Sequence, residues 1–404
     1  MRRAHFHVTY CGNIHAGESW ADTRAHLRQY APAIKARISP QSPFGLGLRL
    51  SKQAATELLQ GQELPLFKRW LQENDLYVFT INGFPFGTFH DVVLKDGVHK
   101  PDWTEATRLE YTRQLFEILA YLLPAHLEGG VSTSPLSYKP WFADKPESLP
   151  EVFQKATENL LKMLERLMEI EENTGKLLHL DLEPEPDGLL ENTEEVLHYF
   201  EAYLVPAAQE FLSHTHALAP LEAENTLKQH IRICYDACHF ALAYEKPEAA
   251  LAQFHRAGIQ IGKFQISTAL KVNWKVDPAD QAAIRQALET FIEPTYLHQV
   301  IAQKADGTLQ QFTDLPPALA AFDGAGQEWR IHFHVPVFQE KFPPLASTQP
   351  ELLALLAQLV QATEHTHYLE IETYTWQVLP SEWQLPLEAS IVRELEWLLK
   401  VLNL

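Results

Sequence analysis

Short apolar runs with strand character alternate with helical stretches along the chain. This order is typical of parallel βα units, and it argues against β-sandwiches and helical bundles. Helices are expected at roughly 103–123, 148–175, 192–216 and 280–293. Eight strands are expected, at 5–10, 44–50, 77–82, 131–135, 177–183, 231–236, 259–267 and 368–373.

Each predicted strand has one apolar and one polar face, because successive side chains of a strand point to opposite sides. In the run 177–183, His179, Asp181 and Glu183 oppose three leucines. An ordinary core would not accept so many ionisable groups unpaired. A closed barrel gives these polar faces one shared interior. We therefore predict an α/β fold, a (β/α)₈ TIM barrel that takes residues 1–404 into a single domain.

A long insertion is expected after the seventh strand, at about 270–337. Within it, Asp306 and Gly307 lie between two alternating runs, which is a hairpin signal. The insertion ends in "WRIHFHVPV", a ninth run with strand character, at 329–337. We expect this last run to return to the mouth of the barrel.

Charge and cysteine content restrict the environment of the protein. The chain has 52 acidic and 33 basic residues, a formal charge of −19, so nucleic acids and anionic membrane surfaces are disfavoured as partners. Its three cysteines, Cys11, Cys234 and Cys238, do not form the spaced framework of a disulfide-rich protein. No leader peptide or membrane-spanning run is apparent. We expect a cytoplasmic protein with a small-molecule substrate.

Carboxylates stand at the ends of three predicted strands. Glu183, Asp236 and Glu372 should meet at the barrel mouth, where their negative charges repel unless a divalent cation binds between them. His239 follows Asp236 by three residues and is either a further metal ligand or a group that holds the substrate. The alternative is that the Asp-x-x-His pair only caps the next helix.

At these residues the chain resembles the xylose isomerase-like TIM barrels, a superfamily of sugar isomerases, ketose epimerases, inosose dehydratases and endonuclease IV. "LDLE", "YDACH" and "EIET" match the family's metal-binding strand ends, which implies Glu183, Asp236, His239 and Glu372 as ligands. The family's seventh-strand histidine falls near Gln265, a weak ligand for a transition metal. His334 or its neighbour His332 could supply the missing nitrogen from the insertion.

Longer segments look like the EboE family of metabolite-traffic proteins, which are encoded beside a prenyltransferase and a dehydroquinate-synthase-like protein. The segments are "HVTYCGNIHAGESW", "VSTSPLSYKPW", "HLDLEPEPDG", "RIHFHVPVF" and "LEIETYTWQVLP". This resemblance implies a setting in secondary-metabolite processing or export, with possible association with other proteins of the pathway.

The first functional hypothesis is a divalent-metal-dependent isomerase or epimerase of a sugar- or polyol-like substrate. Its metal, Zn²⁺, Mn²⁺, Fe²⁺ or Co²⁺, would be held by Glu183, Asp236, His239, His334 and Glu372, and Glu183, Glu372 and His239 would be catalytic. Asn13, just past the first strand, either lines the mouth or only makes its turn. The predicted substrate-binding residues are His332, Gln265, Lys263, Arg49, Asn82 and His7.

Other hypotheses remain open. Arg49 and Lys263 could simply pair with interior carboxylates. The protein could keep the metal and the barrel but carry a metabolite without converting it. A phosphodiesterase like endonuclease IV is disfavoured by the negative charge, and by strands two and three, which end without the metal-binding histidines of that enzyme.

Overall fold

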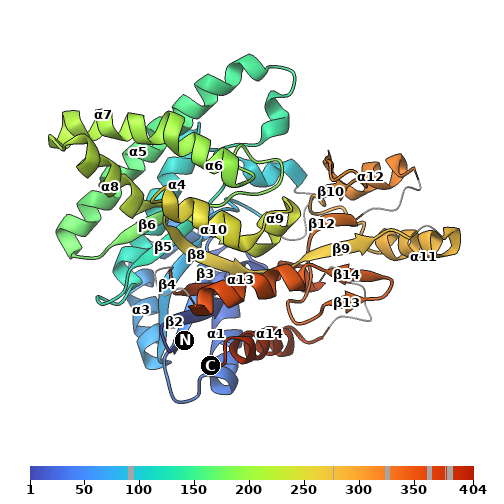
Figure 1. The fold of residues 1–404 in the computed structure, drawn as a ribbon. Coiled ribbons are helices and arrows are strands. Elements are labelled where there is room, and N and C mark those ends of the chain that lie inside the picture. Colours follow the sequence, from blue (N-terminus) through green and yellow to red (C-terminus); the bar gives the residue numbers. More distant parts are fainter. Residues whose placement is uncertain (90–94, 276, 324–327, 362–365, 378, 380–384) are drawn as a thin grey trace.

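The computed structural model describes residues 1–89, 95–275, 277–323, 328–361, 366–377, 379 and 385–404 (Figure 1). Nine strands form the main sheet in the order β1-β2-β15-β8-β7-β6-β5-β4-β3. All neighbouring strands in it are parallel except β1 and β2, which form a short antiparallel pair at Arg2–Arg3. The eight parallel strands are β2 (Phe6–Tyr10), β3 (Phe44–Arg49), β4 (Leu76–Asn82), β5 (Gly129–Thr133), β6 (Leu178–Leu182), β7 (Ile231–Asp236), β8 (Ile261–Ile266) and β15 (Tyr368–Ile371).

These strands coincide with the eight expected runs, and the predicted α/β barrel is confirmed. The ring closes between β2 and β3, where Cys11 and Gly47 form a parallel bridge. The Thr9 hydroxyl adds to this closure, because it donates to the Gly45 carbonyl oxygen (2.8 Å) and accepts from the Gly47 amide (3.0 Å). The polar strand faces therefore share one interior, as the alternating pattern requires.

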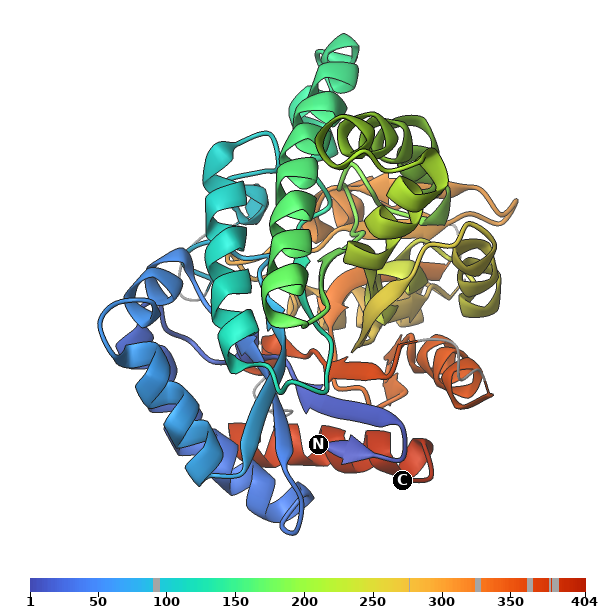
Figure 2. The ribbon, with the colours of Figure 1, turned by 90° about the vertical axis from the view of Figure 1, so that its left-hand side faces the viewer.

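Helices surround the barrel and bury its apolar strand faces. In α5 (Leu149–Thr174), Ala156, Leu160 and Leu164 lie on the buried stripe, and Gly175 ends the helix in the left-handed conformation (φ 69°). Figure 2 shows α4 and α5 running side by side along the outside of the strands. The other helices that follow barrel strands are α1 (Trp20–Ile38), α2 (Lys52–Leu58), α3 (Glu63–Glu73), α4 (Ala106–Leu122), α6 (Thr193–Tyr199), α7 (Val205–His216), α8 (Pro220–His230), α9 (Ala237–Leu242), α10 (Pro247–Arg256), α13 (Gln349–Gln361) and α14 (Leu387–Val401).

The helix expected over 192–216 is interrupted by a π-helical turn at Phe200–Leu204. Pro206 lies at the start of the following helix α7, and proline has no amide hydrogen to donate to the preceding turn. None of the described helices combines the length and apolar character needed to cross a bilayer.

A second, antiparallel sheet begins directly after β8 and stands beside the barrel (Figure 1). Its hairpin, β10 to β11, turns at Gly307 (φ 84°), and its strand β12 carries "IHFH" back toward the barrel mouth. The sheet runs on to Ser347, ten residues past the expected end of the insertion, because β13 and β14 are too short to show a pattern. Its elements are β9 (Ala269–Asn273), α11 (Pro278–Glu289), β10 (Val300–Gln303), β11 (Leu309–Phe312), α12 (Leu315–Ala321), β12 (Glu328–His334), β13 (Lys341–Phe342) and β14 (Leu345–Ser347).

Candidate functional site

Three buried carboxylates meet at the mouth of the barrel. Glu183 follows β6, Asp236 ends β7 and Glu372 follows β15. One oxygen from each lies within 4.8 Å of the others. The three side chains are buried, so water does not screen their mutual repulsion. The chain thus concentrates negative charge in a position that a cation or bound protons must neutralise.

Gln265 on β8 lies among these carboxylates. Its Nε2 donates to Glu183 Oε1 (3.1 Å), to Asp236 Oδ2 (2.9 Å) and to Glu372 Oε2. An amide nitrogen has only two hydrogens, so it cannot satisfy three carboxylates. Glu183 Oε2 has no hydrogen-bond partner among the residues that the structure describes. Gln265, which lies where the resemblance predicts a histidine, therefore only partly neutralises the charge of the three carboxylates.

Protonation differs among the three carboxylates. Burial, assisted by the charge of Asp236, raises the pKa of Glu183 to about 7. Burial also raises the pKa of Glu372 well above its usual range, with Glu183 and Asp236 adding to the shift. For Asp236, burial acts in the same direction, but His239 and His334 outweigh it and its pKa is lowered. Without a cation, the negative charge therefore concentrates on Asp236.

Asp236 also caps the helix that follows it. Its Oδ1 accepts from the amides of Cys238 (2.7 Å) and His239 (3.2 Å) and from Ser267 Oγ (2.6 Å). Its Oδ2 faces Gln265 and lies 4.0 Å from His239 Nε2. The capping alternative is thus observed, but it occupies one oxygen and leaves the other in the cluster.

Three buried histidines stand beside the carboxylates, and each has its Nδ1 engaged. His239 Nδ1 donates to the Pro184 carbonyl (2.8 Å), His332 Nδ1 to Gln299 Oε1 (2.9 Å) and His334 Nδ1 to the Glu372 carbonyl (2.8 Å). Backbone carbonyl oxygens only accept hydrogen bonds, so in the neutral rings the lone pair is on Nε2. This is the arrangement of metal-binding histidines, whose second nitrogen is oriented by a carbonyl or carboxylate.

Within the described part of the chain, the potential ligands form three overlapping groups in which the ligand atoms lie within 4.8 Å of one another. The first is the carboxylate group Glu183, Asp236 and Glu372. The second is Asp236, His239 and His334. The third is Cys238, His332 and His334. Carboxylate and imidazole ligands together fit a divalent cation such as Zn²⁺, Mn²⁺, Fe²⁺ or Co²⁺.

Polar residues that the sequence did not single out complete the cavity. His99 Nε2 and Glu185 Oε1 lie 2.9 Å apart in its wall, and Tyr374 and Gln299 also line it. Glu185 has the same alternation as Glu183 and could have been found from "LEPEP". His99, in the short 3-10 helix Lys95–His99, and Gln299, in the second sheet, carry no such signal, because the tertiary fold alone brings them to the mouth.

Two asparagines donate hydrogen bonds to the Glu372 carboxylate. Asn13, in the turn after β2, donates to Glu372 Oε1 at 2.6 Å, and Asn82, at the end of β4, donates to the same oxygen at 3.2 Å. Both line the cavity, together with Glu183, His239, His332, His334 and Glu372. Of the predicted substrate-binding residues, Asn82 and His332 therefore reach the cavity, while Gln265 lies beneath it among the carboxylates.

Three predicted substrate-binding residues do not line this cavity. Lys263 lies deeper in the barrel than Gln265 and forms a buried ion pair with Glu370. Arg49 donates to the Gly17 carbonyl (3.0 Å) and pairs with Glu18 (3.3 Å). His7 bonds to the Tyr77 hydroxyl (2.8 Å) and lines a different cavity, shared with Arg232 and Tyr368. For Lys263 and Arg49, pairing with carboxylates is the observed arrangement.

Among solved structures, the chain is similar to a xylose isomerase-like TIM barrel protein from Mycobacterium smegmatis in complex with magnesium. The TM-score is 0.50, the identity is 10%, and the match covers 100% of this chain and 99% of that one. The chain has the xylose isomerase-like TIM barrel fold.

Two further solved structures are similar at lower scores. One is a D-tagatose 3-epimerase-like protein (TM-score 0.46, 10% identity, 98% and 97% coverage), and the other is the IolI protein with a binding zinc atom (TM-score 0.45, 11% identity, 98% coverage of each chain). No protein-family model matches the chain, and no curated protein matches it. The resemblance to the EboE family therefore stays a prediction.

Proposed function

We propose that the protein is a divalent-metal-dependent isomerase or epimerase of a small sugar- or polyol-like substrate. The observation that carries the proposal is the convergence of three buried carboxylates with imidazoles of which the Nδ1 atoms are held by backbone carbonyls and which line the same cavity. The cation would be held by Glu183, Asp236 and Glu372 with His239 and His334. The likeness to the mycobacterial protein in complex with magnesium supports a divalent cation in this fold.

A bound cation would polarise a hydroxyl and a neighbouring carbonyl of the substrate and stabilise negative charge on their oxygens. The chain's own residues would then move the proton. Glu183 has an unpartnered oxygen and lines the cavity, so it can take a proton from the carbon next to the carbonyl. Glu372, held by Asn13 and Asn82, can return a proton to that carbon or to its neighbour.

In this proposal, His239 binds the substrate or the cation through its Nε2 atom. Its Nδ1 is fixed by the Pro184 carbonyl, so its Nε2 has one orientation, toward the cavity. There it can hold a substrate oxygen or join the cation. Phe84, Phe89 and Tyr374 lie in the cavity wall, where their rings would shield the reacting carbon of a bound substrate from water.

Within this reaction class, the resemblance to the EboE family favours a secondary-metabolite substrate over a sugar of central metabolism. The same barrel could instead bind such a metabolite and pass it on unchanged. Exchange of a carbon-bound proton separates the two functions, because a carrier breaks no C–H bond.

The test is a screen of ketoses, cyclitols and their phosphates in D₂O with Mn²⁺, Zn²⁺ or Co²⁺, followed by mass spectrometry for deuterium next to the carbonyl. We expect exchange with at least one compound and its loss in Glu183→Gln and in Glu372→Gln. Glu245→Gln is the matched control, because Glu245 binds Thr193 on the outside of the barrel. If a compound binds tightly but exchanges no proton, the protein is a carrier of that compound and not an isomerase or epimerase.

A further inference from the structure

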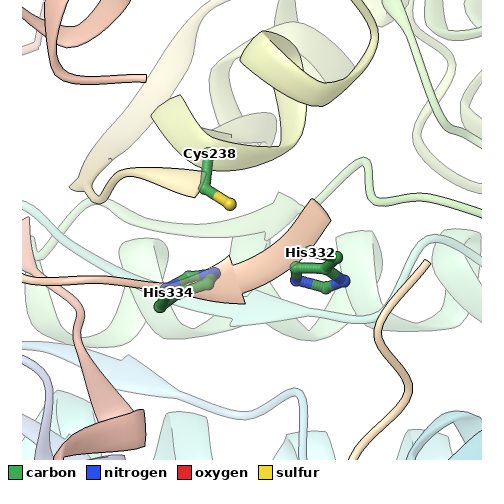
Figure 3. Close-up of side chains that lie close together, drawn as sticks. All are labelled: Cys238, His332 and His334. Atoms are coloured by element: carbon green, nitrogen blue, oxygen red, sulfur yellow. The ribbon is translucent and has the colours of Figure 1, made fainter. Parts of the chain in front are cut away.

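A cysteine and two histidines form a group of their own beside the carboxylates. Cys238, His332 and His334 each offer one ligand atom within 4.8 Å of the others, and all three side chains are buried. Figure 3 shows the Cys238 sulfur directed toward the strand that carries the two rings. The proposed reaction uses His334 but assigns no part to Cys238.

Fixed backbone places each member of this group. Cys238 stands in the first turn of α9, and its amide donates to Asp236 Oδ1 (2.7 Å) and Ser267 Oγ (2.9 Å). His332 and His334 lie on the same face of β12, because they are two residues apart in a strand. Helix α9 therefore positions the thiol, and strand β12 positions the two imidazoles that it faces.

Two atoms in this group have no partner in the described part of the chain. His334 Nε2 is buried and makes no hydrogen bond. Cys238 Sγ is also without a hydrogen bond there, whereas the other thiols have one: Cys234 Sγ donates to Gln265 Oε1 (3.3 Å) and Cys11 Sγ accepts from Asn82 Nδ2 (3.4 Å). A buried imidazole nitrogen left unpaired calls for an explanation, and a bound cation supplies one.

We propose that Cys238, His332 and His334 form a second cation position, with the thiolate and two imidazoles as ligands. This proposal rests on the proposed function only because the second position lies next to the cation position of that reaction. Thiolate and imidazole select Zn²⁺ or Co²⁺, whereas the all-carboxylate group at the other end suits a harder cation such as Mg²⁺ or Mn²⁺. A transition metal such as Zn²⁺ or Co²⁺ should therefore bind preferentially at the position that contains Cys238.

The two positions are linked through Asp236 and His239. His334 belongs both to the thiol group and to the group with Asp236 and His239, and Asp236 belongs to the carboxylate group. Only Nε2 of His334 is available, so this ring can join one cation at a time. When it binds at the thiol end, the first cation keeps Glu183, Asp236, Glu372 and His239 as its ligands. Binding at the thiol end forms a metal–sulfur bond and breaks the S–H bond of Cys238, and its proton leaves to the buffer. No oxidant or reductant is needed.

Cobalt binding tests the proposal, because a thiolate bound to Co²⁺ gives an intense charge-transfer band in the near ultraviolet. Protein stripped with a chelator and titrated with Co²⁺ should develop this band and saturate it at one ion per chain. Cys238→Ser and Cys238→Ala should abolish the band. The matched variants Cys11→Ser and Cys234→Ser should keep it, and His332→Gln should weaken the cobalt affinity of this step by about tenfold or more.

The outcomes separate this proposal from the proposed function. A wild-type protein that binds cobalt with no thiolate band, or a band that persists in a folded Cys238→Ala variant, overturns the second position. A thiolate band that survives in Glu183→Gln/Glu372→Gln, with the remaining cobalt lost, supports it independently of the carboxylates. Circular dichroism confirms that each variant is folded before it is scored.

Discussion

The Nε2 atoms of His239 and His332 lie 3.1 Å apart. Neither ring can turn its Nδ1 toward the other ring. Both Nδ1 atoms are engaged, His239 with the Pro184 carbonyl and His332 with Gln299 Oε1. The Gln299 amide is itself oriented, because its Nε2 donates to the Pro186 carbonyl at 3.3 Å. Two lone pairs at this distance repel each other, so a proton or a cation must lie between the rings.

Cation binding should therefore displace a proton from this histidine pair. We expect Zn²⁺ added to chelator-treated protein at pH 7 to release about one proton from these rings, beyond that from Cys238. Titration calorimetry in buffers of different ionisation enthalpy measures the number, and His332→Gln should reduce it. His230→Gln is the control, because both nitrogens of His230 are bound outside the barrel, by Leu178 and Glu171. Equal proton release in wild type and His332→Gln would contradict the pairing.

Removal of single charges should remove the bound cation while the fold is retained. Asparagine is as good a helix cap as aspartate, so Asp236→Asn keeps the start of α9 but loses the negative charge. We expect Asp236→Asn and Glu372→Gln each to lower cation affinity by about 100-fold or more. Elemental analysis after gel filtration measures the occupancy. Occupancy equal to that of the Glu245→Gln control would show that these carboxylates are not ligands.

Gln265→Glu should make folding depend on the cation. The change replaces the amide, whose nitrogen lies within hydrogen-bond distance of three carboxylates, by a fourth carboxylate of similar shape. Without a cation we expect a loss of roughly 3 kcal/mol in the free energy of unfolding, from buried like charges. Added Mn²⁺ should recover most of this loss, and thermal melts with and without chelator measure both. A variant as stable as wild type in chelator would show that protons alone neutralise the cluster.

The buried pair Lys263 and Glu370 should be structural. Gly47 leaves room for it, since a Cβ there would lie 1.7 Å from Glu370 Oε1. Lys263→Met leaves the Glu370 charge unpaired, and we expect a loss of about 3–5 kcal/mol in the free energy of unfolding. The double variant Lys263→Met/Glu370→Leu should recover much of it. Urea denaturation of the three proteins gives the comparison, and a double variant less stable than the single one would contradict it.

Glu394 should make stability depend on pH. Burial raises its pKa to about 7, above the ordinary value of 4.5, against hydrogen bonds from Thr373 and Val337. The folded state thus favours the protonated form. The resulting stability is full below pH 4.5 and is lost as the pH rises through about 7, up to roughly 3 kcal/mol. Glu394→Gln, neutral at every pH, should flatten this part of the stability curve between pH 5 and 8, as followed by urea denaturation. An unchanged curve would exclude Glu394 as the cause.

The barrel could be predicted from the sequence because apolar and polar residues alternate in each of its short strands. The same alternation put Asp181 and Glu183 on the inner face, together with Lys263 and Gln265. It could not assign depth. Lys263 and Gln265 share a face but lie two residues apart, about 6.6 Å along the strand, which separates a structural ion pair from the carboxylate cluster.

The sequence by itself determined the number of barrel strands, their inner faces and the acidic residues at their ends, because these depend on local alternation. The tertiary structure alone decided that both histidines of the returning strand β12 line the cavity and that the Gln265 amide nitrogen lies within hydrogen-bond distance of all three carboxylates. It also decided that Cys238 meets those histidines. These contacts join residues far apart in the chain, and their distances depend on how the strands are staggered and how the second sheet packs, which no local pattern records.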